Sequence, residues 1–253
     1  MILNIRYDIA SAQSLGTRED QQDSFCWEYT ENGFIAVLCD GMGGMELGAE
    51  ASETAVEAVL RLLRSRPFST APAETLLDAM DIADEAVFRL NAQGEKKIRS
   101  GTTIVTALAQ DDLLYWLSVG DSRMFIVRAG QVIRATRDHN YYMLLDDLLR
   151  SGDISAEEYR TRSEKGHALI SYIGMRGIRY YDVSETPLPL LPEDILILAS
   201  DGLYVGVTDE DILLLCSSNG SAQELADSLL QCSAVKSGGS QDNATIITII
   251  CKG

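Results

Sequence analysis

Four short apolar segments follow one another between Gly101 and Ala135, with no helical pattern between them. They are residues 101–109, 113–119, 123–128 and 131–135, separated by Asp-Asp, Gly-Asp-Ser and Ala-Gly turns. Strands that are joined directly by turns pair antiparallel, whereas successive parallel strands need a helix between them. The chain is therefore predicted to contain an antiparallel meander, and a doubly wound nucleotide-binding fold is disfavoured.

Two apolar runs end in an Asp-Gly pair. Residues 34–39 lead into Asp40 and Gly41, and residues 194–199 are followed by Asp201 and a second glycine. A carboxylate at the end of a buried strand is costly unless a cation or hydrogen-bond donor meets it. The glycine lets the chain turn sharply and leaves its carbonyl open to a ligand. A hard divalent cation would satisfy both groups, and a plain strand-to-helix turn is the alternative interpretation.

Two further aspartates have similar settings. Asp242 precedes the last apolar segment, residues 244–251, and Asp121 follows a glycine in a turn. Aspartate is common in turns, so each of them alone has a structural explanation. Four such aspartates, three of them beside glycine, predict a cluster of oxygen ligands for a hard metal. Softer metals are disfavoured because the two histidines, His139 and His167, lack ligand spacing.

The remaining elements follow from periodicity and punctuation. Strands are expected at 2–11, 24–29, 34–39 and 244–251, and helices at 47–64, 72–93, 209–216 and 221–235, with Pro67 and Gly94 ending the first two helices. The polar segment 141–178 interrupts the strands, and capping-box spacing from Ser155 to Glu158 predicts a helix start. We interpret 141–178 as a flap within one domain that spans residues 1–253.

Composition excludes several classes of partner. The formal net charge is −17, from 21 basic and 38 acidic residues. This charge repels nucleic-acid backbones and anionic lipid, so we expect neither as a partner. The five cysteines are scattered and form no Cys-x-x-Cys pair, which is typical of a reduced, cytoplasmic protein. The N-terminus has no signal-peptide pattern, and no apolar run approaches the roughly 20 residues that a membrane span needs.

Several enzyme classes are also disfavoured. No cysteine has an arginine six positions later, so the loop of the cysteine-nucleophile phosphatases is absent. The chain has no Gly-x-Ser-x-Gly elbow and no Gly-x-x-x-x-Gly-Lys phosphate loop. The run Asp209-Glu210-Asp211 imitates an aspartyl-phosphate nucleophile motif. It follows Thr208 at a predicted helix start, which favours N-capping.

A series of short motifs identifies a family resemblance. In chain order they are Arg18-Glu19-Asp20-Gln21-Gln22-Asp23, Asp40-Gly41-Met42-Gly43-Gly44 with Gly48 to Ser52, Ser100-Gly101-Thr102-Thr103, Val119-Gly120-Asp121-Ser122-Arg123, Asp138-His139, Ala199-Ser200-Asp201-Gly202-Leu203 and Asp242-Asn243. Together they resemble the metal-dependent protein phosphatases of type 2C (PPM family), above all the compact bacterial branch. The resemblance covers nearly the whole chain. It implies an α+β fold, a four-layer αββα sandwich in which two central five-stranded antiparallel sheets are flanked by pairs of helices, with a short flap.

The resemblance also implies a site for two manganese or magnesium ions in the channel between the sheets. Asp40 would bridge both ions, and the Gly41 carbonyl would bind one of them. Asp201 and Asp242 would complete the shell of the other ion. Asp121, together with Asp201, resembles the pair that holds a third, weaker ion in bacterial members.

The same resemblance suggests a reaction. Arg18 would bind the substrate phosphate, and Asp23 would bind a metal-bound water. Two divalent cations lower the pKa of a bridging water, and the resulting hydroxide would attack phosphorus in line. We therefore expect a cytoplasmic, monomeric protein serine/threonine phosphatase that acts on phosphorylated proteins, with a serine/threonine kinase as its counterpart.

The chain departs from the family pattern at a few positions. Met42 and Met45 stand where other members have a histidine, so the source of the leaving-group proton stays open between a metal-bound water and His139. We interpret His139 as a structural residue that holds a turn. Gln22 stands where animal members often have glutamate, so a water would fill that coordination place.

Two alternative functions remain at this point. The first is a non-catalytic phosphoprotein-binding protein on the same fold, which the retention of the aspartates and Arg18 disfavours. The second is a phosphatase dedicated to one regulatory phosphoprotein. Rapid, EDTA-sensitive turnover would separate the first alternative from an enzyme, and substrate profiling is needed for the second.

Overall fold

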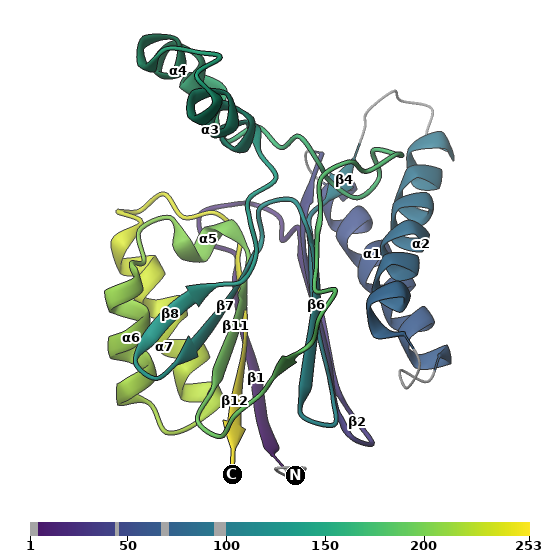
Figure 1. Cartoon of the computed structure of the whole chain (residues 1–253), viewed down its shortest axis with the longest axis vertical. Coiled ribbons are helices and arrows are strands. Elements are labelled where there is room, and N and C mark those ends of the chain that lie inside the picture. Colours follow the sequence, from purple (N-terminus) through teal and green to yellow (C-terminus); the bar gives the residue numbers. More distant parts are fainter. Residues whose placement is uncertain (1–4, 44–45, 67–70, 94–99) are drawn as a thin grey trace.

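In the computed structural model, which describes residues 5–43, 46–66, 71–93 and 100–253, two antiparallel sheets pack face to face and helices cover their outer faces (Figure 1). The strands are β1 (Arg6–Ser14), β2 (Asp23–Thr30), β3 (Gly33–Met42), β4 (Gly101–Thr102), β5 (Ile104–Gln110), β6 (Leu113–Val119), β7 (Arg123–Arg128), β8 (Gln131–Arg134), β9 (Asp182–Val183), β10 (Leu188–Pro189), β11 (Ile195–Ala199) and β12 (Ala244–Lys252). The helices are α1 (Glu46–Ser65), α2 (Pro72–Gln93), α3 (Tyr141–Ser151), α4 (Ala156–Arg162), the short 3₁₀ helix η1 (Ser163–Lys165), α5 (Asp201–Tyr204), α6 (Asp209–Ser218) and α7 (Ala222–Lys236).

The two sheets differ in strand number. The first sheet has five strands, which is the expected number, and their order is β1-β12-β11-β7-β8. The second has the order β10-β6-β5-β3-β2, and β4 and β9 pair beside this path with β3 and β6, which makes seven strands. The expectation of five strands in each sheet is therefore wrong for the second sheet. Part of the reason is that the chain returning from the flap runs along β6 and pairs with it in two short steps, β9 and β10.

The predicted single strand 101–109 is also divided. Thr103 separates β4 from β5, and β4 pairs with the last residues of β3, Gly41 and Met42. The threonine uses its own polar groups to bond Asp40: its N–H donates to the Asp40 carbonyl at 2.8 Å, and its Oγ1 accepts from the Asp40 N–H at 3.0 Å. The interruption of the strand therefore holds the end of β3 in place.

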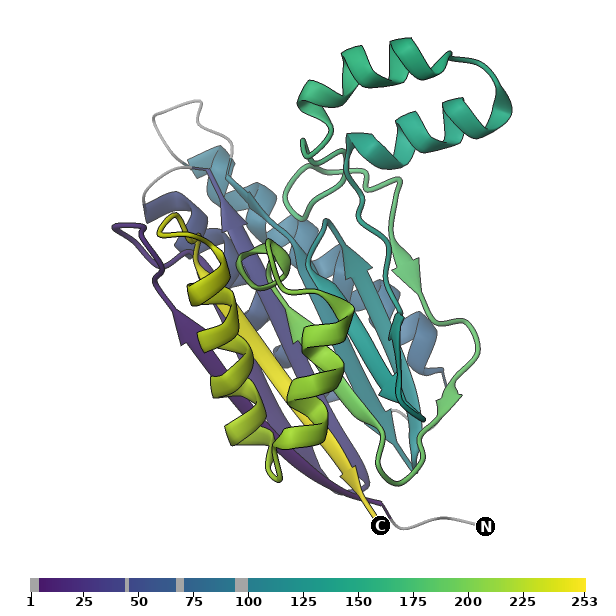
Figure 2. The same ribbon diagram turned by 90° about the vertical axis from the view of Figure 1, so that its left-hand side faces the viewer.

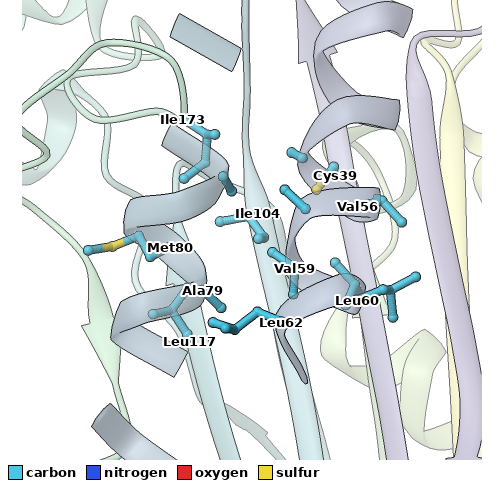
Figure 3. Packing of buried hydrophobic residues seen from close by; sticks show 14 of the residues in the cluster. Cys39, Val56, Val59, Leu60, Leu62, Ala79, Met80, Ile104, Leu117 and Ile173 are labelled. Atoms are coloured by element: carbon cyan, nitrogen blue, oxygen red, sulfur yellow. The ribbon is translucent and has the colours of Figure 1, made fainter. Parts of the chain in front are cut away.

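Both faces of β3 are apolar because each face packs into a different core. Alternate side chains, Ile35, Val37 and Cys39, enter a core shared with α1 and α2, part of which Figure 3 shows. The intervening side chains, Phe34, Ala36 and Leu38, enter the core between the two sheets. A third apolar cluster lies between the first sheet and α5 to α7. Three cores separate four layers, so the predicted α+β, four-layer αββα arrangement is confirmed.

The apolar stripe predicted for α1, which consists of Ala55, Val59, Leu62 and Leu63, is buried. In α2 the predicted residues Leu76, Met80, Ala83 and Val87 are buried, whereas Leu90, the last of the predicted stripe, is only partly buried. The predicted helix ends at Pro67 and Gly94 lie outside the described residues. The one-turn helix α5, which begins at Asp201, was not expected.

The flap segment projects beyond one end of the sheets as a hairpin of α3 and α4 (Figures 1 and 2). The capping box from Ser155 to Glu158 is present at the start of α4, as predicted. At the base of the hairpin, the Tyr141 N–H donates to the Ala168 carbonyl and the Tyr142 N–H to the Gly166 carbonyl, both at 2.9 Å. The outgoing and returning arms of the flap are therefore bonded to each other where they leave the body.

Three smaller points from the sequence can be compared with the structure. All five cysteines are free thiols. Thr208 forms a capping box with Asp211 at the start of α6, which supports the structural interpretation of the acidic run there. Within the described residues, none of the helices has both the length and the apolar character needed to cross a bilayer.

Candidate functional site

A cavity of about 610 Å³ brings together most of the residues singled out in the sequence. Its lining is formed by Thr17, Arg18, Glu19, Asp20, Gln22, Asp40, Gly41, Met42, Gly43, Thr103, Asp121, His167, Leu169, Asp201, Asp242 and Asn243. All of the predicted site residues except Asp23 are among them. The lining is mostly polar, and it combines residues from both sheets with residues of the flap.

Asp40 stands near the end of β3, directly opposite Asp23 in the antiparallel pairing of β2 and β3. This register answers a question that the sequence left open, because it places the loop that carries Arg18 at the Asp40 end of the sheet. Burial raises the pKa of Asp40 well above its usual value, and the negative charge of Asp23 raises it further. The next residue, Gly41, has no room for a side chain: a Cβ there would lie 2.1 Å from the Gly48 carbonyl oxygen.

Asp23 lies behind the cavity wall and is 5% exposed. Its Oδ2 accepts hydrogen bonds from the Ser200 hydroxyl at 2.8 Å and the Thr245 hydroxyl at 2.7 Å. Burial raises the pKa of Asp23, and these two hydroxyls oppose the increase. Thr245 lies on β12 of the first sheet, Ser200 directly follows β11 of that sheet, and Asp23 begins β2 of the second, so the carboxylate is held across the space between the sheets. Its other oxygen, Oδ1, is buried and has no hydrogen-bond partner.

Asp201 and Asp242 enter the cavity from the first sheet. Asp201 begins α5 just after β11, and Asp242 precedes β12. The two chain segments pass so closely that a Cβ on Gly202 would lie 2.0 Å from the Asn243 carbonyl oxygen, which explains the glycine after Asp201. Burial raises the pKa of Asp201 to about 7, with contributions from the charges of Asp121 and Asp242.

Asp121 reaches the cavity from the turn between β6 and β7. Burial, followed by the charge of Asp138, raises its pKa to about 6. The Tyr204 hydroxyl donates to the Asp121 carbonyl at 2.7 Å and so ties this turn to α5. The Arg123 guanidinium lies 3.4 Å from the centre of the Tyr204 ring and forms two hydrogen bonds with Asp138, at 3.0 and 2.8 Å.

Arg18 supplies a positive charge at the mouth of the cavity. Its guanidinium is exposed and lies 2.5 Å from Asp242 Oδ2. A planar guanidinium with several N–H groups is well suited to a phosphate group, which accepts the same bidentate hydrogen bonds as a carboxylate. Arg18 is therefore placed to exchange Asp242 for an incoming anion.

The two histidines have different surroundings. His139 is fully buried. Its ring Nδ1 accepts a hydrogen bond from the Gly120 N–H at 3.2 Å, and its backbone N–H donates to the Gly120 carbonyl at 2.8 Å. These bonds hold the turn that carries Asp121, which supports the structural interpretation of His139. His167, by contrast, lines the cavity. Met42 also lines it, and Met45 lies outside the described residues.

Sequence reasoning gave no role to Tyr204 or His167. No sequence pattern distinguishes Tyr204, which follows the Asp201-Gly202 pair at the predicted end of a strand. For His167 the one available signal was rarity, since the chain has only two histidines. Ser200 was quoted within a motif, and Thr245 only within the last strand, but neither position indicates a bond to Asp23.

The side chains at the cavity fit a hard divalent cation. The available donors are carboxylate and carbonyl oxygens, which magnesium and manganese prefer. The acidic groups raise one another's pKa values, and the buried Asp23 Oδ1 lacks a partner, so a positive charge or a hydrogen-bond donor would be stabilised there. Within the described part of the chain, no three side chains of His, Cys, Asp or Glu already stand within reach of one ion. The carboxylates share the cavity but approach it from separate elements.

Comparisons with known proteins agree with this picture. Residues 14–237 match the family described as protein phosphatase 2C. The serine/threonine phosphatase stp of Listeria monocytogenes is 29% identical over 231 residues, which cover 88% of this chain and 86% of that protein. The solved structure of the serine/threonine phosphatase Stp1 from Staphylococcus aureus is similar with a TM-score of 0.82 at 25% identity, covering 100% of this chain and 98% of that one. The catalytic domain of the serine/threonine protein phosphatase PstP, solved with two manganese ions, is similar with a TM-score of 0.77 at 25% identity, covering 99% and 100%.

Proposed function

This chain belongs to the protein phosphatase 2C family, and from that membership we infer that it is a metal-dependent enzyme that hydrolyses phosphoserine and phosphothreonine in proteins. The single observation that carries this inference is the lining of one cavity, to which Asp40, Asp201 and Asp242 contribute carboxylates and Arg18 a guanidinium. Oxygen ligands for cations and a cationic clamp for phosphate are the two components that metal-assisted phosphate hydrolysis requires.

We propose that the cavity holds two divalent cations. Asp40 would serve both ions, the Gly41 carbonyl would bind one of them, and Asp201 with Asp242 would hold the other. Asp121, with Asp201, would hold a third and weaker ion. The support is that all five residues line one cavity and that their carboxylates raise one another's pKa values. Manganese and magnesium both suit this donor set, and a similar solved structure contains two manganese ions.

When bound, the cations would lower the pKa of a water molecule, so that it could attack phosphorus near neutral pH. Arg18 binds the phosphate oxygens and offsets the charge that develops on them. Asp23 would bind a metal-bound water through Oδ1, the buried oxygen without a partner, while its Oδ2 stays fixed by Ser200 and Thr245. No covalent phosphoenzyme is needed.

The test is hydrolysis of a phosphothreonine peptide by the purified chain in manganese, with and without EDTA. We expect EDTA-sensitive turnover that Asp40→Asn and Asp242→Asn abolish without unfolding the protein, because each change removes a charged ligand. Asp111→Asn is the matched control, since Asp111 lies in the turn between β5 and β6 and not in the cavity lining. Phosphopeptide binding without turnover would favour the non-catalytic alternative, and near-wild-type rates in both variants would refute the two-ion site.

We further propose that residues 1–253 act as one phosphatase domain, with 141–178 as a flap within it. The support is that the three cores share their sheets, and that the two arms of the flap are bonded at its base. The enzyme is proposed to act as a cytoplasmic monomer that opposes a serine/threonine kinase. Sedimentation at micromolar concentration tests the monomer, and phosphoproteomics after deletion of the protein identifies its substrates and tests whether it serves one regulator or many.

A further inference from the structure

Hydrolysis of a serine or threonine phosphate has a requirement that the carboxylates and Arg18 do not meet. The seryl or threonyl oxygen leaves as a strongly basic alkoxide unless it receives a proton as its bond to phosphorus breaks. The aspartates that hold cations are ionised, and a guanidinium does not release its proton. The proton donor for the leaving oxygen must therefore be a metal-bound water or another residue on the cavity wall.

Among the described residues that line the cavity, His167 is the one imidazole. Imidazole is the side chain that enzymes most often use for proton transfer near neutral pH. The other acidic groups on the wall, Glu19 and Asp20, are carboxylates, and all three side chains, including His167, are exposed, so exposure does not distinguish them. Met42, which also lines the cavity, has no proton to give.

The fold holds His167 in position from several directions. Its ring makes an edge-to-face contact with Tyr142, with ring centres 5.0 Å apart and planes at 85°. The preceding glycine, Gly166, packs so closely on the same tyrosine that a Cβ would lie 2.2 Å from the ring. The following residue, Ala168, accepts the Tyr141 N–H. These contacts bind the segment around His167 to the start of α3, and so fix it at the base of the flap.

We propose that His167 is a catalytic residue of this enzyme, the flap-borne acid that protonates the departing seryl or threonyl oxygen; this rests on the proposed phosphatase function. In the step, the oxygen of water bonds to phosphorus while the bond from phosphorus to the side-chain oxygen breaks. The electron pair of the broken bond remains on the side-chain oxygen, which takes a proton from His167. The proton of the attacking water is released to solvent, and His167 later recovers one. The products are a hydroxyl side chain and inorganic phosphate.

The proposal predicts a dependence on the leaving group. The variant His167→Gln is compared with wild type on p-nitrophenyl phosphate, phenyl phosphate and a phosphoserine peptide. The nitrophenolate leaves without help, whereas phenoxide and alkoxide need a proton. We expect kcat to fall by roughly 100-fold or more on the last two substrates, which is the usual size of general-acid catalysis, and by only a few fold on the first. Glu164→Gln, an exposed neighbour in the flap, is the matched control and should behave as wild type.

The comparison separates the possible failures. An equal loss on all three substrates would assign His167 a structural or binding role and overturn the proposal, as would no loss on any of them. Inactivity of the wild type on every substrate would instead refute the phosphatase function itself.

A second measurement does not depend on turnover. The His167 ring resonances, identified by their loss in His167→Gln, are followed by nuclear magnetic resonance in magnesium while inorganic phosphate is added. We expect these resonances to shift while those of the buried His139 stay in place. Resonances of His167 that do not respond to phosphate would overturn its contact with the substrate.

Discussion

The hydroxyl of Thr103 is the feature whose removal gives the clearest test of how the site is built. Thr103 is 2% exposed. Its Oγ1 accepts the Asp40 N–H at 3.0 Å and lies 2.6 Å from the Ser122 hydroxyl oxygen. One hydroxyl thus links the end of β3 to the turn that carries Asp121. Thr103→Val keeps the shape of the side chain and removes both bonds.

The expected cost follows from the groups that remain. The Asp40 N–H loses a partner and the Ser122 hydroxyl, 1% exposed, loses one as well. A buried polar group left without a partner costs about 1–3 kcal/mol, and the serine hydroxyl can rotate to recover part of its loss. We therefore expect the free energy of unfolding to fall by about 2–3 kcal/mol. In a chain of this length that corresponds to a decrease in Tm of roughly 4–12 °C.

The assay is urea and thermal unfolding in EDTA, followed by calorimetric titration with manganese. Thr106→Val is the matched control, because Thr106 lies three residues further on, in β5, and is 1% exposed, but its hydroxyl has no hydrogen-bond partner. Removal of that hydroxyl should leave stability unchanged or slightly increased. Manganese affinity should fall in Thr103→Val alone, since only there is the Asp40 backbone released. Equal stability of the two variants would refute the claim that Thr103 anchors the site.

Three further predictions concern single side chains. Asp121→Ala should lower turnover by roughly 10–100-fold and leave two ions bound; calorimetry that finds no ions bound would contradict its peripheral role. Arg18→Ala should raise KM for a phosphopeptide by roughly tenfold, the usual effect of losing a charged hydrogen bond at an exposed site, and an unchanged KM would place the phosphate clamp elsewhere. Burial raises the pKa of Asp182, but contacts with His139 and Arg137 outweigh it and lower the pKa to about 2. Because this folded-state pKa is depressed, the stabilisation is complete above the unfolded pKa near 4 and is lost as pH falls towards 2. Asp182→Asn should therefore flatten the loss of stability between pH 4 and pH 2 in urea unfolding, and identical pH profiles would disprove the linkage.

Much of the architecture could be predicted because it rests on local patterns. The alternation of β3, the stripes of α1 and α2 and the turns between β5 and β8 are each visible in a window of a few residues. The family resemblance then supplied the layer order, which periodicity alone does not provide. The extra short strands of the second sheet were missed because two-residue pairings such as β9 and β10 leave no periodic signal.

The sequence predicted the acidic residues of the site better than the residues that form hydrogen bonds with them. Asp40 and Asp201 stand beside glycines at strand ends, a pattern with a physical reason at each position. The bonds from Ser200 and Thr245 to Asp23 span 177 and 222 positions, so no local pattern indicates them. His167 was missed for a related reason, because only the folded flap brings it to the cavity.

The anchoring of Asp23 by hydroxyls of the opposite sheet has a consequence for how this enzyme should fail on heating. The Asp23 carboxylate, for which we propose a role in holding a water molecule, keeps its position only while the two sheets remain aligned. A slip of about one ångström between them would leave every helix and strand intact, yet would misdirect the nucleophile, and displacements of that size cost roughly a hundredfold in rate. On heating, activity should therefore be lost at a lower temperature than the circular dichroism signal. The rate of turnover would then report whether the two sheets are still aligned.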